Sequence, residues 1–532
     1  MTARPGALAG SGQLVRLVLR RDRVRLPVWL VAVLGLVYAS AAAVQSTYGT
    51  PEQREVYART IGESPASIAF SGPPVALDTL GGVTVFEVNQ TTVLAVALMA
   101  VFLTVRHTRA EEEAGRAELL HAAPVGAAAP LAAALAVVGA ACVVAGIGVA
   151  AVFLGLGLPS RGSLVYGASV AALGLCFAVV AACAAQVTEH TRGALGLAGT
   201  ALAVAFVVRA AGDVAGSWLV WASPIGWSQA VHAFDPAGGD RWAPLLVPAA
   251  FVAVLGTLTL ALLHHRDLGA GLVPPRPGPA GAGPLLAGVP GLTLRLQRGA
   301  LAGWAAGLFL GGLTMGSVSG DVRELVETNE QLAEFFAARG DVVDAFLTTV
   351  LLVLALVAGG FAVSSVLRMH AEETAGRAEL LLATGLSRWR WTGGSLLVTV
   401  PGIAAVVAAG GSGLGVAHAL VTGDAAQVLR LAGFALVFLP APLVLAGLAV
   451  LLLGWLPGAA PAAWAALAGC LVIGWLGDLL GLPAAVRDLS PFSHVPRVPL
   501  EPVTVGPLAG LTALAVVLGA AGLVGFRRRD VG

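Results

Sequence analysis

The stretch from Ala110 to Leu120 reads AEEEAGRAELL, and a second copy from Ala371 to Leu381 reads AEETAGRAELL. The two copies agree at ten of eleven positions and are offset by 261 residues, about half of the 532-residue chain. A long apolar run precedes each copy, and another follows it. The repeat therefore predicts two halves, each with a short charged helix that joins two membrane-spanning helices.

The composition sets the fold class around this repeat. The chain is 57% hydrophobic and 11% charged, its mean hydropathy is +0.86, and long apolar runs recur along it. These values predict an all-α polytopic membrane protein with about 12 transmembrane helices in two tandem six-helix halves, and they exclude a soluble multidomain enzyme. The expected spans are residues 26–44, 91–107, 128–157, 164–186, 193–211 and 243–263 in the first half, and 299–318, 345–367, 393–420, 428–455, 459–480 and 505–526 in the second.

The order of segments predicts the domain organisation and the orientation. We expect a first transmembrane half at residues 1–270, a Pro/Gly-rich cytoplasmic linker at 271–291 and a second half at 292–532. A basic amphipathic helix at 11–25 is expected to lie on the cytoplasmic membrane surface. Because six spans is an even number and the arginines concentrate on the segments placed inside, we expect both termini in the cytoplasm. The use of arginine alone, with abundant Ala, Gly, Val and Leu, suggests a GC-rich bacterial genome, so we expect a multi-pass protein of a bacterial cell membrane.

A polar segment at residues 45–90 follows the first expected span. The tetrapeptide TPEQ at 50–53 has the residues of a helix N-terminus: a threonine cap, a proline at the first helical position and a glutamine at the third. We expect a short helix from there to about Ile61, and a second surface helix at residues 321–340 of the other half.

The chain contains no lysine, so all 31 of its basic residues are arginines. A phosphate-binding loop of the form G-x-x-x-x-G-K-[ST] needs its lysine to reach the nucleotide, so this chain cannot contain one. No metal-binding or nucleophile motif such as HExxH or GxSxG is present either. We therefore expect no enzymatic activity, no metal and no cofactor in this chain; if ATP drives it, another chain binds the ATP.

Ionisable residues within membrane spans mark ion or proton pathways, because a charge is costly in lipid. Here Arg209, Asp213, His418 and Asp478 fall near the ends of expected helices, and the span centres are Ala, Val, Leu and Gly. This pattern gives little support to proton-coupled transport. His418 is interpreted as a histidine whose hydrogen bonds are satisfied within the protein.

Two pairs of opposite charge favour a helix at each copy of the repeat. Glu112 with Arg116, and Glu373 with Arg377, stand four residues apart with the acid first, an arrangement worth about 0.2–0.5 kcal/mol per pair. A solvated connector whose charges only keep it out of lipid remains an open alternative. The unchanged order Gly-Arg-Ala-Glu-Leu-Leu in both copies favours a specific role, since solubility alone would accept many charge orders.

The chain resembles ABC-2 type transporter permeases, and more narrowly the actinobacterial permeases described as exporters of polyketide antibiotics, in which two transmembrane halves are fused. The resemblance covers essentially the full length, and E-E-x-A-G-R-A-E-L-L at 111–120 and 372–381 is its most specific motif. In that family the helix between the second and third spans is a coupling helix, which docks in a cleft of an ATPase subunit. Carried over, the docking residues would be Glu111, Glu112, Gly115, Arg116 and Glu118 in the first copy, and Glu372, Glu373, Gly376, Arg377 and Glu379 in the second.

The resemblance implies ATP-driven export by this chain together with a separate ABC ATPase subunit, present in two copies, that binds ATP and Mg. The ATPase pair would push both coupling helices and switch a cavity between the halves from inward-facing to outward-facing. The implied substrates are hydrophobic or amphipathic drug-like compounds from the cytoplasm or the inner leaflet; membrane lipids are expected contacts, and nucleic acid is not. The alternatives are a major-facilitator-type secondary transporter driven by an ion gradient, and a membrane-embedded transferase or scaffold.

Overall fold

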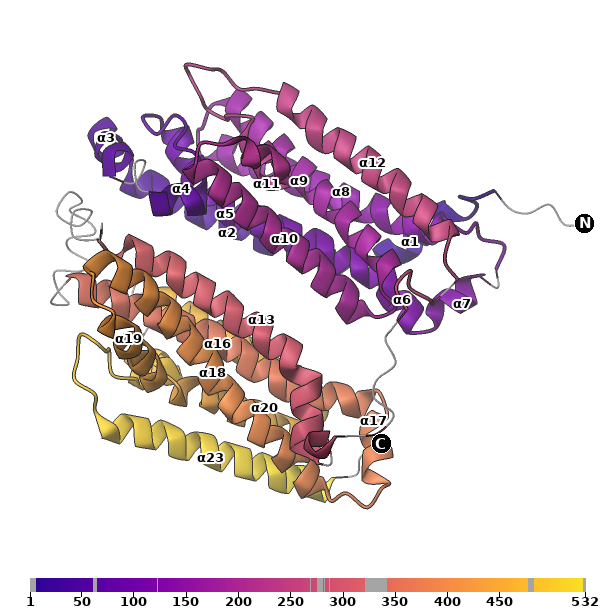
Figure 1. Ribbon diagram of the computed structural model, residues 1–532, viewed down its shortest axis with the longest axis vertical. Coiled ribbons are helices and arrows are strands. Elements are labelled where there is room, and N and C mark those ends of the chain that lie inside the picture. The colour runs from indigo at the N-terminus through magenta and orange to yellow at the C-terminus, as the bar shows by residue number, and fades with distance from the viewer. Residues whose placement is uncertain are drawn as a thin grey trace, which may run out of the picture. The chain divides into compact units, whose positions relative to one another are not determined.

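The computed structural model describes residues 6–60, 65–121, 123–267, 269–274, 281, 283–286, 288–320, 342–476 and 483–529. Over these residues the chain forms helices, turns and loops, with no strand. Within this described part, twelve helical segments are long and apolar enough to cross a membrane, which confirms the all-α polytopic fold. The chain divides into two compact units, Met1–Gly278 and Pro279–Gly532, each with a hydrophobic core of its own (Figure 1).

The first unit contains six of the spanning segments and several shorter helices. Its helices are α1 (Ser11–Arg21), α2 (Arg25–Thr47), α3 (Pro51–Thr60), α4 (Pro65–Ser71), α5 (Leu80–His107), α6 (Arg109–Glu113), α7 (Arg116–His121), α8 (Ala129–Gly155), α9 (Ser160–Val187), α10 (Thr191–Val214), η1 (Trp218–Ala222), α11 (Pro224–Gln229), η2 (Ala243–Leu245) and α12 (Leu246–His264). The short helices α3 and α4 lie at one end of this bundle, and α6 and α7 lie at the other (Figure 1).

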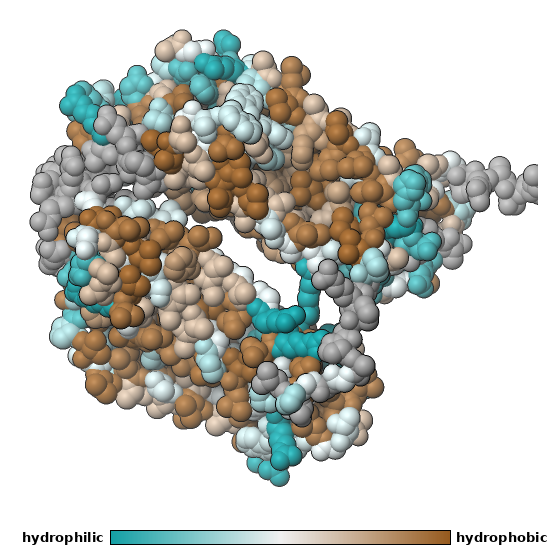
Figure 2. Space-filling view, in the orientation of Figure 1, coloured by the Kyte–Doolittle hydropathy of each residue, from teal (hydrophilic) through white to brown (hydrophobic). Residues whose placement is uncertain are grey.

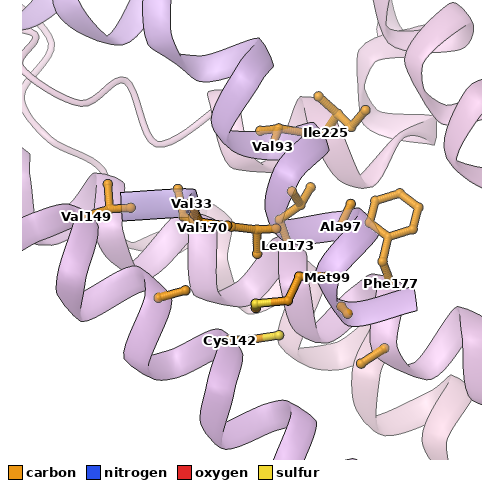
Figure 3. Close-up of a cluster of buried hydrophobic side chains, with 14 of the residues drawn as sticks. Val33, Val93, Ala97, Met99, Cys142, Val149, Val170, Leu173, Phe177 and Ile225 are labelled. Carbon is orange, nitrogen blue, oxygen red and sulfur yellow. The ribbon is translucent and has the colours of Figure 1, made fainter. Parts of the chain in front are cut away.

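Helix α9 is central in the first unit, because it packs against α5, α8, α10 and α12. The core between these helices consists mostly of small and branched apolar side chains. Figure 3 shows Met99 of α5, Cys142 of α8 and Leu173 and Phe177 of α9 within one such cluster. In lipid, helices gain little from hydrophobic burial, so close packing of small side chains supplies much of their association.

The start of α5 corrects the sequence prediction. The second span is expected at residues 91–107, but α5 begins eleven residues earlier, at Leu80. Asn89 and Gln90 are buried in the unit and are bonded to side chains of α9 and α10, at 3.3 and 3.2 Å. Because these polar groups find partners inside the protein, a stretch of low hydropathy is helix and not loop.

Helix α3 follows the sequence prediction. The Thr50 hydroxyl accepts a hydrogen bond from the amide of Gln53 at 3.3 Å, and the side-chain oxygen of Gln53 accepts one from the amide of Thr50 at 3.0 Å. This reciprocal pair satisfies two of the amide groups that a helix start leaves unpaired. The predicted N-terminus is therefore confirmed, and the predicted last residue, Ile61, lies outside the described residues.

The second unit also contains six spanning segments. Its helices are η3 (Pro284–Leu286), α13 (Val289–Ser317), η4 (Val318–Gly320), α16 (Val342–Thr374), α17 (Arg377–Leu382), α18 (Arg388–Thr422), α19 (Ala426–Val437), α20 (Pro440–Trp455), η5 (Pro457–Ala462), α21 (Ala463–Leu476), α22 (Ala484–Arg487), η6 (Pro491–His494) and α23 (Val505–Arg528). The surface helix expected at 321–340 and the predicted span-end residue Asp478 lie outside the described residues.

Close helix contacts hold the second unit together. α18 packs along α13 and α19, and α20 packs along α23 and α16. A Cβ atom added to Gly413 of α18 would lie 1.9 Å from the carbonyl oxygen of Phe309 in α13, so only glycine permits this approach. The span expected at 428–455 is broken between α19 and α20, where Pro440 starts the second helix.

Many outward-facing side chains of both units are large and apolar. Leu246 and Val254 on α12 are 72% and 68% exposed, and Val516 and Val517 on α23 are 65% and 62% exposed. Figure 2 shows apolar side chains over the flanks of each unit and polar ones gathered toward its ends. Exposed apolar flanks of this extent suit helices that face lipid.

Candidate functional site

The first copy of the repeat folds as two short helices, α6 and α7, separated at Gly115. Gly115 has φ of +70°, in the left-handed region that glycine adopts without strain. In the second copy, α16 ends at Thr374, Gly376 has φ of +71°, and α17 follows. The expected single short helix is therefore corrected in both copies: the glycine ends one helix and lets the next take a new direction.

The break at the glycine changes the charge pairing that the sequence predicts. Arg116 binds Glu111, five residues before it, with Nε 2.8 Å from Oε2 and Nη2 3.0 Å from Oε1. This bond raises the pKa of the Arg116 guanidinium above its usual value. The predicted pair of Arg116 with Glu112 is wrong, because the Glu112 carboxylate binds other arginines. In the second copy Arg377 likewise binds Glu372, with Nε 2.5 Å from Oε2.

Glu112 is bound to an arginine from the end of the first unit. Arg266, which follows α12, approaches both Glu112 carboxylate oxygens, with Nη1 2.8 Å from Oε2 and Nη2 2.5 Å from Oε1. Glu373 has the same type of partner in the second unit, since Nη2 of Arg529, which follows α23, lies 2.6 Å from its Oε2. Each copy of the repeat is thus fastened to the segment that follows the last spanning helix of its own unit.

Arg109 fastens α6 to the bundle from the inside. Its side chain is fully buried, and Nη1 lies 2.7 Å from Oε2 of Glu112. The guanidinium also donates to backbone carbonyl groups at the end of α9 and after α12: Ala185 at 2.9 Å, Gly269 at 3.3 Å and Ala270 at 3.1 Å. α6, α9 and the segment after α12 therefore meet at one side chain.

The amphipathic helix α1 belongs to the same cluster. Arg21, at its last position, binds Glu111 with Nη1 2.7 Å from Oε2. The next residue, Asp22, is fully buried and lies 2.5 Å from Nε2 of His107 and 3.3 Å from Nε of Arg106. α1 also packs along α8. The polar face of α1 is therefore bonded to the repeat as well as being suited to a membrane surface.

A glutamate and the leucine after it face away from the bundle in each copy. Glu118 on α7 and Glu379 on α17 are exposed. The leucine that follows each glutamate is more exposed than most large apolar side chains of the protein, at 76% for Leu119 and 73% for Leu380. Two exposed leucines at matching positions form a feature that the sequence interpretation did not single out.

The structure thus separates the predicted docking residues into two sets. The inner set is bonded to arginines of its own unit and comprises Glu111, Glu112, Glu372 and Glu373. The outer set lies at or near the surface and comprises Gly115, Arg116, Glu118, Gly376, Arg377 and Glu379. In the first unit the inner set holds the short helix α6 on the bundle, whereas in the second unit Glu372 and Glu373 belong to the end of the spanning helix α16. The outer set is the more exposed of the two.

A second polar cluster lies toward the opposite end of the first unit. Arg209 of α10 is fully buried, with Nη1 3.2 Å from Oδ2 of Asp213 and Nη2 3.2 Å from Oε1 of Gln90. Nη2 also donates to the carbonyl oxygen of Phe70 in α4, at 3.0 Å. The sequence interpretation placed Arg209 near a helix end but gave it no partners. These bonds tie α4, α5 and α10 together.

The described residues offer no group of three or more His, Cys, Asp or Glu side chains able to hold a metal ion. His418 of α18 is buried, and its Nδ1 lies 2.8 Å from the hydroxyl of Ser319. The interpretation of His418 as a histidine with a hydrogen-bond partner inside the protein is confirmed.

Two helical units with six candidate spans each and a matched charged repeat in each unit define a multi-pass membrane protein. Over 535 aligned positions the chain is 38% identical to the multidrug efflux system permease protein Rv1217c of Mycobacterium tuberculosis, covering 99% of this chain and 96% of that protein. A family model described as the C-terminal domain of multidrug efflux system permease Rv1217c matches residues 286–527. The chain therefore belongs to this permease family.

Proposed function

We propose that this chain is the transmembrane permease subunit of an ATP-driven ABC exporter in a bacterial cell membrane. Two copies of a separate ATPase subunit bind the two copies of the repeat on the cytoplasmic side, and the cargo is hydrophobic or amphipathic, drug-like compounds. The mycobacterial relative supports the cargo, since it is named as a multidrug efflux system permease. The absence of lysine supports a separate ATPase, because no phosphate-binding loop can form in this chain.

The observation that carries this proposal is the pair of outward-facing helices α7 and α17. Each is six residues long and presents an exposed leucine, Leu119 or Leu380, directly after an exposed glutamate. An apolar side chain within a charged rim has the character of an interface anchor, because docking removes the apolar group from water while the rim stays polar. Two matched anchors suit two copies of one partner.

The ion pairs of the inner set connect the docking surface to the spanning helices. Glu112 is held by Arg266, whose side chain is only 3% exposed, and Glu373 by Arg529. Breaking a buried ion pair leaves an uncompensated charge, so such a contact resists separation.

A partner that pushes α7 acts on α6 through the bond of Arg116 to Glu111, and one that pushes α17 acts on the end of α16 through the bond of Arg377 to Glu372. From α6 and α16 the displacement reaches the segment after the last spanning helix of the same unit. In this proposal ATP-driven closure of the ATPase pair acts on the spans through these contacts.

Co-purification with the ATPase encoded beside this chain tests the proposal. A double variant, Glu118→Arg with Glu379→Arg, reverses two exposed charges without touching the inner ion pairs. We expect the double variant to lose the complex and the stimulated ATP hydrolysis, while its thermal unfolding in detergent is unchanged. The matched control is Glu52→Arg, an exposed glutamate of α3 at the other end of the first unit, which should behave as wild type. Full complex formation by the double variant contradicts the proposal.

The alternative of a secondary transporter makes the opposite prediction in intact cells. ATP-driven export stops when ATP is depleted and continues when an uncoupler collapses the ion gradient while ATP is maintained. Efflux that stops with the uncoupler and survives ATP depletion supports the major-facilitator-type alternative instead.

A further inference from the structure

Glu87 of α5 is an acidic side chain in a candidate membrane span. None of the ion pairs described above for the first unit includes it. It lies on the exposed face of α5, two turns from the helix start. Among the described residues it has no cation within ion-pair distance, whereas Asp213, in another span, binds Arg209 at 3.2 Å. A carboxylate at such a position is costly in lipid unless it faces water or meets a cation. Glu87 is therefore a candidate contact for a positively charged ligand.

One aromatic side chain is bonded to this carboxylate, and two further rings pack against that side chain. The hydroxyl of Tyr57, on α3, donates a hydrogen bond to Oε1 of Glu87. The Tyr57 ring lies 4.6 Å from the ring of Tyr48 and 6.2 Å from that of Phe86, between centroids. Burial and the nearby charge of Glu87 raise the pKa of Tyr57 well above its usual value of 10.0, so the phenol stays protonated as a donor. Tyr57 is therefore the ring bonded to the carboxylate, and Tyr48 and Phe86 each pack against it. Tyr57 and Phe86 are buried, and Tyr48 is half-buried.

The side chain of Arg54 fixes the segments that carry the two tyrosines. Arg54 of α3 donates to the carbonyl oxygen of Asp78, just before α5, at 2.9 Å, and to those of Tyr48 and Gly49 at 3.1 and 2.9 Å. These bonds tie α3 to the end of α2 and to the start of α5. A site on rigid elements loses little freedom when a ligand binds, which favours affinity.

An apolar stripe continues from Glu87 along the same face of α5. Leu94, Leu98 and Phe102 follow at spacings of seven, four and four residues, which places them on one side of the helix. Leu98 and Phe102 are 37% and 45% exposed, and Trp29 of α2 stacks on Phe102 with centroids 6.2 Å apart. The exposed face of α5 therefore has one acidic side chain near its start, followed by a row of apolar side chains.

We propose that Glu87, with the half-buried Tyr48 near it, is a recognition site for lipophilic organic cations. The charge of the cation meets the carboxylate, and its apolar body lies along Leu94 to Phe102, while the buried Tyr57 and Phe86 support the site from behind. Aromatic faces attract cations, and the attraction grows when water is excluded. This inference rests on the proposed export of drug-like compounds and names their class. Tyr57 acts as a positioning residue, since its hydroxyl orients the carboxylate.

The test measures binding of tetraphenylphosphonium to the purified full-length chain in nanodiscs of uncharged lipid. Tetraphenylborate, an anion of similar size, is the second probe. Glu87→Gln should weaken tetraphenylphosphonium binding by at least about tenfold, and Tyr48→Leu should weaken it by less. Neither substitution should weaken tetraphenylborate binding. Glu52→Gln, which removes an exposed charge from the first turn of α3, is the matched control and should leave both affinities unchanged.

Equal affinity of wild type and Glu87→Gln for tetraphenylphosphonium overturns the inference. A parallel loss for both probes also overturns it, because it would report a general change in the apolar surface. Thermal unfolding shows that each variant is folded before binding is measured. The measurement needs no ATPase, so a failed ATPase complex with intact cation selectivity contradicts only the proposed function, and a normal ATPase complex with no effect of Glu87→Gln contradicts only the cation site.

Discussion

Arg266 approaches both carboxylate oxygens of Glu112, at 2.5 and 2.8 Å, although 154 residues separate them in the chain. Arg529 binds Glu373 at 2.6 Å across 156 residues. In each unit the segment after the last spanning helix therefore returns to the same glutamate of the repeat. A glutamate used in this way belongs to the unit's own structure, and the exposed residues that follow it are left for a partner.

Replacing Arg266 with methionine should destabilise the first unit. Removing one partner of a buried ion pair typically costs about 3–5 kcal/mol, so we expect the Tm of the full-length protein to fall by several degrees. Arg529→Met should lower it less, because Arg529 is 19% exposed and Arg266 only 3%. Thermal unfolding in detergent measures both. An equal or larger effect at Arg529 would be incompatible with this ranking.

The same pair predicts non-additive effects. Once Arg266 is gone, the Glu112 carboxylate retains Arg109 but loses one of its two arginine partners. Adding Glu112→Gln to Arg266→Met removes that charge, so the double variant should lose less stability than the sum of the two single variants. A simple sum would mean that the two side chains do not interact.

Gly115→Ala should weaken the repeat without blocking folding. A side chain at φ of +70° costs about 1–2 kcal/mol, and no atom lies within 4 Å of the added Cβ, so the strain is in the backbone alone. We expect reduced ATPase stimulation and a modest fall in Tm, with Gly115→Asn milder because asparagine tolerates this conformation better. Gly299→Ala, a helical glycine with equally open surroundings, is the control. Wild-type stimulation by Gly115→Ala would argue against a required turn.

Arg209→Leu should be among the most destabilising single substitutions in the first unit. It leaves Asp213 and Gln90 without their buried partner and releases the carbonyl oxygen of Phe70. Arg59→Leu removes an exposed ion pair on α3 and should change the Tm little. Comparing the two melting curves checks the prediction, which a similar small shift for both would refute.

Much of the fold could be predicted because the spans depend on local pattern. Hydropathy alone locates ten expected spans close to where helices form, and the TPEQ signature at 50–53 predicts the start of α3. The span expected at 299–318 starts ten residues late, because α13 begins at Val289 and its first turns contain Arg295 and Arg298. The early start of α5 escaped prediction because Asn89 and Gln90 lower the local hydropathy, and their partners on α9 and α10 are distant in sequence. The sequence alone does not distinguish a polar residue that is hydrogen-bonded inside a helix bundle from one that is exposed in a loop.

The candidate site was located from the repeat, but its inner and outer residues could not be distinguished from sequence. Helical spacing predicts Glu112 beside Arg116, and the left-handed Gly115 overrides that spacing. The sequence has Arg-Asp at 266–267 and again at 529–530. Nothing local, however, links Arg266 to a glutamate 154 residues away. Glu87 falls in the predicted polar segment at 45–90 for the same reason that the predicted second span starts too late.

Photo-crosslinking from the exposed leucines tests the central claim most directly. A photoreactive amino acid replaces Leu119, Leu380 or, as a control, Leu429, which is 81% exposed. Leu429 is on α19, a helix toward the end of the second unit opposite α17 (Figure 1). In the co-expressed, ATP-hydrolysing assembly, the account predicts crosslinks to the ATPase subunit from positions 119 and 380 and none from 429. An active assembly that crosslinks from neither 119 nor 380, or that crosslinks from 429, would contradict it.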